Sequence, residues 1–282
     1  MKGTVSCALF VFLFAPLFAQ ANVETVLGNV ALDQNPNLAL MPPRTSESEI
    51  IISRAQYVIS YNRIRRGPNW VAWLVEDSDL GHVKRANDFT KDPDLENYLS
   101  HMKEGTAVDF NDYNGSCFER GHQTPSGDRT DTVQNNSETF MMSNMLPQTP
   151  YLNEVIWNHL EQYTRTLVQQ QGKKVYVIAG SIYDLDFGAI GPQRDIKVPS
   201  KNFKILIVLD KNQSPADINA KTQVIAAIMP NSLADGSAPT PFSNGCKGFN
   251  PGGSGTPDDW KPFQSTVKDI ERISGMNFGL PN

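Results

Sequence analysis

Two groups of short apolar segments, separated by one stretch with helical spacing, constrain the fold of this chain more than any other feature. The segments are rich in β-branched and aromatic residues, a composition typical of buried strands. In chain order they are residues 51–52, 57–61, 70–75, 174–180, 203–209 and 222–229. Gly, Asp or Pro closes each of the later three. The pattern predicts one large, mostly antiparallel sheet.

The stretch Asn153–Gln171, between the two groups, is predicted to be the long helix in the middle of the chain. Its apolar residues recur at helical spacing, at Val155, Leu160, Tyr163 and Leu167. Residues 234–260 are rich in Gly, Ser and Pro and indicate a long loop, whereas residues 266–273, before Gly275, indicate a short closing helix. With 39% hydrophobic and 20% charged residues among 282, the composition is that of a globular protein. We therefore predict a single α+β domain whose central sheet is flanked by helices.

The first residues of the chain have the pattern of a signal peptide. Lys2 precedes the apolar run Ala8–Phe14, and Ala19-Gln20-Ala21 supplies small residues of the kind found at cleavage sites. An uncleaved membrane anchor is the alternative, but the run is shorter than the roughly 20 residues that span a bilayer. We expect residues 1–21 to be removed, which would make the product secreted or periplasmic and leave it without a membrane contact.

The mature chain would then begin with a loosely ordered lead-in over residues 22–49, followed by the folded domain over residues 50–282. Cys7 would leave with the signal peptide, so Cys117 and Cys246 would be the cysteines of the mature chain. An oxidising compartment would permit a disulfide between them. Two separate buried thiols are the alternative, because geometry decides whether two cysteines pair.

The charge of the chain argues against a protein coated in positive charge. Its formal net charge is −5, and loss of Lys2 makes it about one unit more negative. A polyanionic partner would have to be bound by local groups of basic residues. The candidates are Arg63, Arg65, Arg66, Lys84, Arg85, Arg120 and Arg129. For the three arginines at 63–66, scattered solvated charges are the simpler interpretation.

A polar segment around His122 and the predicted helix that follows it carry the residues best suited to chemistry. Four helix residues are spaced by four, namely Asn153, Trp157, Glu161 and Arg165. They line one side, because each step shifts the direction by only about 40°. Their amide, carboxylate and guanidinium groups near a histidine form a candidate phosphodiester site. By spacing alone, a structural histidine and a surface helix with a Glu161–Arg165 ion pair explain the pattern better.

Four motifs taken together favour the phosphodiester site over the structural interpretation. In chain order they are Asn69-Trp70-Val71-Ala72-Trp73 with Arg85, Glu119-Arg120-Gly121-His122, Ser143-Asn144-Met145 with Pro147-Gln148, and Asn153 through Glu161. They resemble motifs of the DNA/RNA non-specific endonucleases with the ββα-metal fold, which include secreted bacterial nucleases and the mitochondrial endonuclease G type. The resemblance spans roughly residues 27–281. One departure is visible, because Glu119 stands where the family usually has Asp.

The resemblance implies a general base and a metal site. His122 would take the proton of the attacking water, a task that suits its unperturbed pKa of about 6.5. Asn153 would bind a divalent ion directly through its amide oxygen, and Glu161 would bind it through water. The expected ion is Mg²⁺, with Mn²⁺ as an alternative, because one amide and several waters discriminate poorly between them.

The same resemblance implies roles for four further residues. Arg85, Arg120 and Arg165 would pair with phosphate oxygens, since a guanidinium offers a planar fork that stays charged. Among them Arg85 and Arg165 are the first candidates, and Arg120 has a positional role as its alternative. Asn144 would orient His122 or the metal-binding loop, with a purely structural turn as the alternative.

The function predicted on this basis is that of an endonuclease with little sequence specificity. Both DNA and RNA would be cut to give 5′-phosphate ends, because reading only phosphate and metal carries no sequence information. A catalytically weakened nucleic-acid-binding homologue is the second hypothesis, and it rests on the extra methylene of Glu119. A structural zinc site is a weak third hypothesis, because His82, His101 and His159 are dispersed. The oligomeric state is not indicated.

Overall fold

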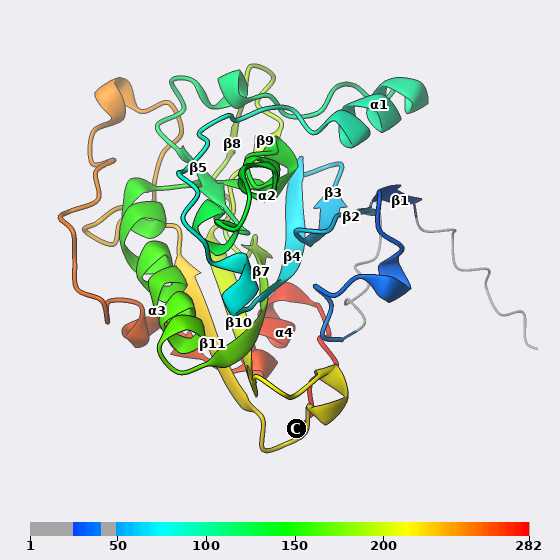
Figure 1. Ribbon diagram of the computed structural model, residues 1–282. Helices are drawn as coiled ribbons and strands as arrows, with labels where there is room; N and C mark the ends of the chain where they lie inside the picture. The colour runs from blue at the N-terminus through cyan, green and yellow to red at the C-terminus, as the bar shows by residue number, and fades with distance from the viewer. Residues whose placement is uncertain (1–24, 41–48, 282) are drawn as a thin grey trace, which may run out of the picture.

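A large sheet runs through the protein, for which the computed structural model describes residues 25–40 and 49–281 (Figure 1). Within these residues the strands are ordered β1-β2-β3-β4-β7-β10-β11-β12. β1 pairs parallel with β2, and all other neighbours are antiparallel. The strands are β1 Thr25–Gly28, β2 Glu49–Ser53, β3 Val58–Asn62, β4 Gly67–Val75, β7 Lys173–Ile182, β10 Lys201–Asp210, β11 Gln223–Pro230 and β12 Gln264–Ser265. The predicted large, mostly antiparallel sheet is confirmed.

Two small sheets and a few helices complete the described part of the chain. One sheet pairs β5 Glu119–His122 with β6 Met145–Gln148, and the other pairs β8 Ala189–Ile190 with β9 Ile196–Lys197. The α-helices are α1 Pro93–Met102, α2 Val133–Glu138, α3 Asn158–Gln169 and α4 Val267–Ser274. A π-helical segment, Tyr151–Trp157, runs directly into α3. This pair of helical segments confirms the predicted middle helix, with the difference that its first turns are wider than an α-helix.

Helix α4 begins and ends where its sequence signals place it. The Thr266 side chain accepts a hydrogen bond from the backbone N–H of Asp269, which caps the first turn. At the other end, Gly275 takes the left-handed conformation with φ 73°, which costs a glycine little.

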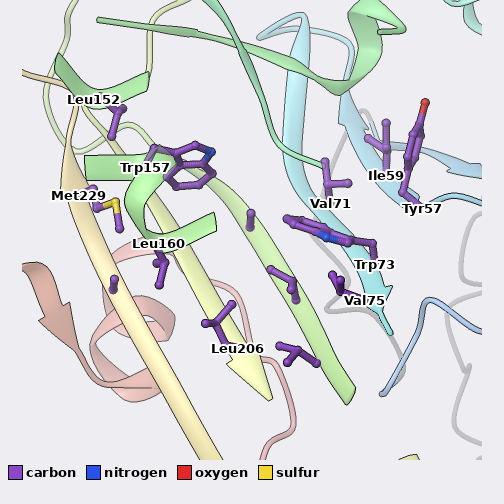
Figure 2. Close-up of a cluster of buried hydrophobic side chains, with 14 of the residues drawn as sticks. Tyr57, Ile59, Val71, Trp73, Val75, Leu152, Trp157, Leu160, Leu206 and Met229 are labelled. Atoms are coloured by element: carbon purple, nitrogen blue, oxygen red, sulfur yellow. The ribbon is translucent and has the colours of Figure 1, made fainter. Parts of the chain in front are cut away.

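Both faces of the sheet are buried, each under a different helical element. On one face the π-helical segment and α3 place Leu152, Trp157 and Leu160 against strand residues such as Val71 and Leu206 (Figure 2). The opposite face is covered by α4, the residues after it and residues 32–40. Because side chains alternate along a strand, β10 serves both layers at once.

The predicted loosely ordered lead-in is wrong for residues 25–40, which are built into the fold. β1 adds to the edge of the sheet, and two asparagines of this segment bind strand residues. Asn35 Nδ2 donates to Ser53 Oγ at 2.9 Å, and Asn37 Oδ1 accepts from the backbone N–H of Leu74 at 3.1 Å. Glu49, the last residue of the predicted lead-in, begins β2, whereas the predicted signal peptide and residues 22–24 and 41–48 lie outside the described residues. Within the residues that are described, no helix is both long and apolar enough to cross a bilayer.

The alternative left open for the two cysteines is settled by a disulfide. Cys117 and Cys246 are bonded across a sequence separation of 129 residues. The bond joins the segment that leads into β5 to the long loop of residues 234–260, which is a loop as predicted.

Candidate active site

The small β5–β6 sheet and the helical segment after it form a ββα unit that holds the candidate residues. His122 pairs with Met145 in the ladder, and Glu119 pairs with Gln148 at the other end. The Gln148 side chain crosses over Gly121, where a Cβ atom would lie 2.1 Å from Gln148 Oε1. The glycine of the motif is therefore required by close packing.

The helical segment runs alongside β5 and the turn after it, in the same chain direction. Three hydrogen bonds join the two, and their partners occur in the same order along both segments. They are Asn153 Nδ2 to Glu119 Oε2 (2.8 Å), Trp157 Nε1 to the His122 carbonyl (3.1 Å) and Arg165 Nη1 to Asp128 Oδ1 (2.9 Å). Three of the four residues spaced by four thus bind one segment, residues 119–128. The structure brings this predicted row together on the side of the helix that faces His122.

His122 is buried between two aromatic rings. The imidazole packs edge-to-face against Phe89 and Phe140, whose ring centres lie 5.5 and 4.8 Å from its own. Burial, reinforced by the nearby charge of Arg85, lowers the pKa of His122 to about 3. A ring N–H donates to the backbone carbonyl of Arg120, and Nε2 has no hydrogen-bond partner among the described residues. The imidazole is therefore neutral and has a free lone pair at Nε2.

This environment makes the protonation state of His122 directly testable. In the metal-free protein, the His122 ring resonances are expected to stay at their neutral positions as the pH is lowered from 8 to 5, because burial disfavours the imidazolium. Two-dimensional NMR of ¹⁵N-histidine-labelled protein measures this, and the same spectrum of His122→Gln assigns the resonances. A titration midpoint near the ordinary value of about 6.5 would contradict the assignment.

Two of the predicted arginines lie on the same aromatic pair. The guanidinium of Arg120 lies 4.4 Å from the ring centre of Phe89, and that of Arg85 lies 4.8 Å from the ring centre of Phe140. Arg85 Nη1 also donates to Ser126 Oγ at 2.8 Å. Stacking on an aromatic face keeps a guanidinium in place. Arg85 Nε donates to Asn87 Oδ1 at 2.8 Å, so Nη2 is the nitrogen left to bind an anion.

A groove of about 480 Å³ opens beside these residues. It is lined by Arg85, Phe89, Tyr113, Asn114, Gly115, Cys117, Phe118, Glu119, Arg120, Asn153, Glu154 and Cys246. Two arginines and two asparagines thus face one space next to the buried imidazole, together with the carboxyl groups of Glu119 and Glu154. A phosphate group in this groove would meet positive charge from Arg85 and Arg120.

Asn153 and Glu119 offer the oxygen atoms that a hard cation prefers. Because the amide nitrogen of Asn153 is bonded to Glu119, its Oδ1 is the atom left for a ligand. Burial raises the pKa of Glu119 to about 7, an effect that the bond from Asn153 opposes. Among the described residues, no group of three or more His, Cys, Asp or Glu is placed to hold a metal ion. The donor set fits Mg²⁺ or Mn²⁺, which keep several waters and take few protein ligands, better than it fits zinc.

Glu161 and Arg165 pair with different partners from those that their spacing suggested. Glu161 Oε1 lies 3.6 Å from Lys204 Nζ, while Arg165 pairs with Asp128. Asp128 is buried, and its second oxygen accepts from Trp73 Nε1 at 2.9 Å. Burial raises the pKa of Glu161, and the charge of Lys204 opposes this shift. Arg165 is thus engaged in fixing the turn after β5 rather than standing free in the groove.

Asn144 is fully buried and acts on the chain just beyond His122. Its amide accepts from the backbone N–H of Thr124 and donates to the carbonyls of Thr124 and Thr139, at distances of 2.9 to 3.0 Å. These bonds hold the backbone two residues after the imidazole. The structure therefore shows Asn144 in a structural role in the turn after β5, and the orientation of His122 by Asn144 stays a prediction.

The other basic candidates are not part of the groove. Arg129 is 3% exposed and donates to the carbonyls of Leu74 and Gln56, so it anchors the fold. Arg63 pairs with Glu104, and Arg66 pairs with Asp195.

Several residues of the site did not follow from the sequence. Phe89 and Phe140 carried no signal, because single aromatics in polar segments are common. Asp128 lies in the polar segment after His122 but has no spacing that links it to Arg165. Lys204 had a usable signal, because it is a charged residue in the middle of the apolar run 203–209.

Comparison with known proteins places this geometry in a family. The model of the DNA/RNA non-specific endonucleases matches residues 35–280. A protein named nuclease from Nostoc sp. is 34% identical over 247 residues, which covers 86% of this chain and 78% of that protein. Mitochondrial endonuclease G of Homo sapiens is 28% identical over 242 residues, with coverage of 82% and 69%.

A solved structure agrees in fold. The crystal structure of an EndoG/EndoGI complex contains a chain that superimposes with a TM-score of 0.61 at 24% sequence identity, covering 81% of this chain and 84% of the other. The family match spans the sheet, the ββα unit and the groove. This chain is a nuclease that belongs to the DNA/RNA non-specific endonuclease family.

Proposed function

We propose that this nuclease is an exported, metal-dependent endonuclease that cuts DNA and RNA with little sequence preference. In this proposal His122 is the general base and Asn153 holds the metal. The observation that carries it is the neutral imidazole of His122, with an unpaired Nε2, on the same strand as the carboxylate that binds Asn153.

The residues around His122 keep its imidazole neutral and leave Nε2 free to act as the base, and burial lowers its pKa below the value of about 6.5 that the sequence suggested. The flanking phenylalanines keep bulk water from the ring, and the bond to the Arg120 carbonyl fixes the tautomer in which Nε2 is the base. Asn144 holds the backbone that follows. A water molecule that attacks phosphorus can then lose its proton to Nε2.

The groove supplies the charge that the phosphodiester needs. Arg85 and Arg120 bind its non-bridging oxygens, and Arg165 contributes by holding Asp128. A divalent ion at Asn153 would add charge neutralisation at the phosphate. Glu161, whose side chain is 11% exposed, would accept hydrogen bonds from water bound to such an ion.

Broad substrate use follows from this set of contacts. Guanidinium groups and an amide can recognise phosphate, whereas sequence is read from base edges. DNA and RNA, single- or double-stranded, are therefore the expected substrates, with 5′-phosphate products.

The test is cleavage of supercoiled plasmid DNA and of total RNA by the purified mature protein with Mg²⁺, with Mn²⁺ and with EDTA. Loss of both activities in EDTA, and their return with added metal, supports the proposal. Product ends are read by labelling before and after phosphatase treatment. Undiminished cleavage in EDTA would contradict metal dependence, and digestion of one polymer alone would contradict the broad substrate range.

A substitution of Glu119 distinguishes this proposal from the second hypothesis, a catalytically weakened nucleic-acid-binding homologue. Its carboxylate reaches Asn153 at 2.8 Å, so the longer side chain keeps a contact with the proposed metal residue. Glu119→Asp is therefore expected to lower kcat at a fixed, low Mg²⁺ concentration by about 10-fold, the effect typical of losing a residue that orients a ligand.

Plasmid nicking by Glu119→Asp and by the control Glu104→Asp, whose carboxylate pairs with Arg63 away from the groove, measures this effect. The weakened homologue predicts the opposite, because aspartate would restore the residue usual in the family. A rise in kcat would therefore favour that second hypothesis.

Export is supported by the apolar N-terminal run and by the disulfide between Cys117 and Cys246, which is a bond typical of oxidising compartments. Sequencing the N-terminus of protein recovered outside the cytoplasm would test cleavage after residue 21.

A further inference from the structure

A lysine lies in the interior of the molecule, at the middle of β10. Lys204 has a side chain that is 1% exposed, and its neighbours Phe203 and Ile205 pack on the opposite face of the sheet. Lys204 therefore lies on the face that carries α3. Burying an ammonium group is costly unless charges or dipoles compensate it, so this position requires a specific partner.

The two nearest partners of Lys204 belong to the helical segment, whereas the ring centre of Trp73, on β4, lies 5.9 Å from Nζ. Its Nζ lies 3.6 Å from Glu161 Oε1 and 3.8 Å from the ring centre of Trp157. No hydrogen bond to Nζ forms among the described residues. The ammonium group is thus held by charge and by the face of the indole, as in a cation–π contact.

Both partners lead to the active site. The Trp157 ring that lies against Lys204 donates from Nε1 to the backbone carbonyl of His122 at 3.1 Å. Glu161 is the carboxylate, 11% exposed, that the proposed function places beside the metal-bound water. The Lys204 ammonium group therefore contacts one side chain that binds the backbone of the proposed base and another that is proposed to act at the metal.

We infer that Lys204 is a positioning residue for the nuclease reaction. Its ammonium group, which lies against the Trp157 ring, holds the carboxylate of Glu161 in place by charge. This inference rests on the proposed function. Lys204 does not reach the groove, so it acts through Glu161 and not on the substrate. The neighbouring carboxylate of Asp128 is already bound by Arg165 and Trp73, which leaves Glu161 as the group that the Lys204 charge serves.

The first test removes the charge and keeps the volume. Lys204→Met is expected to lower kcat on plasmid DNA by about 10- to 100-fold, the range found when a partner that orients a metal site is lost. The matched control is Asn202→Leu, which replaces a buried polar residue on the same face of β10 by an apolar one. The control is expected to keep wild-type kcat. Wild-type kcat in Lys204→Met would overturn the inference.

A double-mutant cycle separates positioning from a general effect on the fold. In the background of Glu161→Gln, Lys204→Met is expected to cause no further loss, because the group through which it acts is already neutral. An equal fold-loss in both backgrounds would overturn the inference while leaving the role of Glu161 intact. If Glu161→Gln itself cleaves like wild type, the proposed function of Glu161 fails, and the inference fails with it.

Folding is controlled within the same experiment. Each variant is purified as a monodisperse species, and its thermal unfolding is recorded beside its kcat. Lys204→Gln is a second neutral variant if Lys204→Met does not refold. The double variant Glu161→Gln/Lys204→Met leaves no unpaired buried charge, so it is expected to fold and its comparison with Glu161→Gln remains decisive.

Discussion

His122→Ala is expected to lower kcat for plasmid cleavage by about 10²- to 10⁴-fold, the contribution typical of a general base. The reason is that Nε2 of the neutral imidazole is the unpaired basic atom at the centre of the site. Substrate affinity should change little, because the arginines of the groove are untouched. Single-turnover nicking at saturating Mg²⁺, with DNA binding measured in parallel in Ca²⁺, provides both quantities.

The matched control is His159→Ala, which removes another buried imidazole from α3 at a position beside Gly255 and Asp259. It should cost stability through lost packing but leave kcat close to that of wild type. If His122→Ala keeps more than about a tenth of the wild-type kcat, a general base of the ordinary strength is excluded at this position.

Asn153→Ala should abolish most cleavage at millimolar Mg²⁺, with a loss of at least about 100-fold. Even residues that only orient a metal ligand cost 10- to 100-fold when removed, so loss of the direct ligand should cost no less. The substitution also leaves Glu119 without the amide that binds it.

Activity measured against Mg²⁺ concentration distinguishes metal binding from other roles of Asn153. The activation curve of Asn153→Ala is expected to shift to higher Mg²⁺, and Asn153→Asp, which keeps an oxygen ligand, should recover part of the activity. An unchanged half-maximal Mg²⁺ concentration with reduced kcat would show that Asn153 does not hold the ion.

The large strands could be predicted because they are long, apolar and β-branched. The runs at 70–75, 174–180 and 203–209 fall inside β4, β7 and β10, and the run at 222–229 falls inside β11 except for Thr222. β5 and β6 could not be recognised as strands, because Glu-Arg-Gly-His and Met-Leu-Pro-Gln carry no alternation of apolar and polar residues. Their pairing depends on tertiary packing around Gly121.

The site residues could be named from motifs, but their environment could not. Nothing local to His122 predicts the two phenylalanines that bury it, because they lie in distant parts of the chain. The same holds for Glu161, whose partner is on a strand far along the sequence rather than one helical turn away. Spacing predicts which residues share a helix side, whereas the partners of that side follow from the packing of sheet and helix.

The division of the sheet into two faces has a practical consequence for engineering. The helical segment of the ββα unit packs on one side of the sheet, while the layer formed by α4 and residues 32–40 packs on the other. Substitutions that improve packing in that second layer should add to thermal tolerance independently of turnover, since distant sites contribute nearly additively. Phe278, Ile270 and Met276 mark the layer from which a heat-resistant variant could be built without altering the reaction.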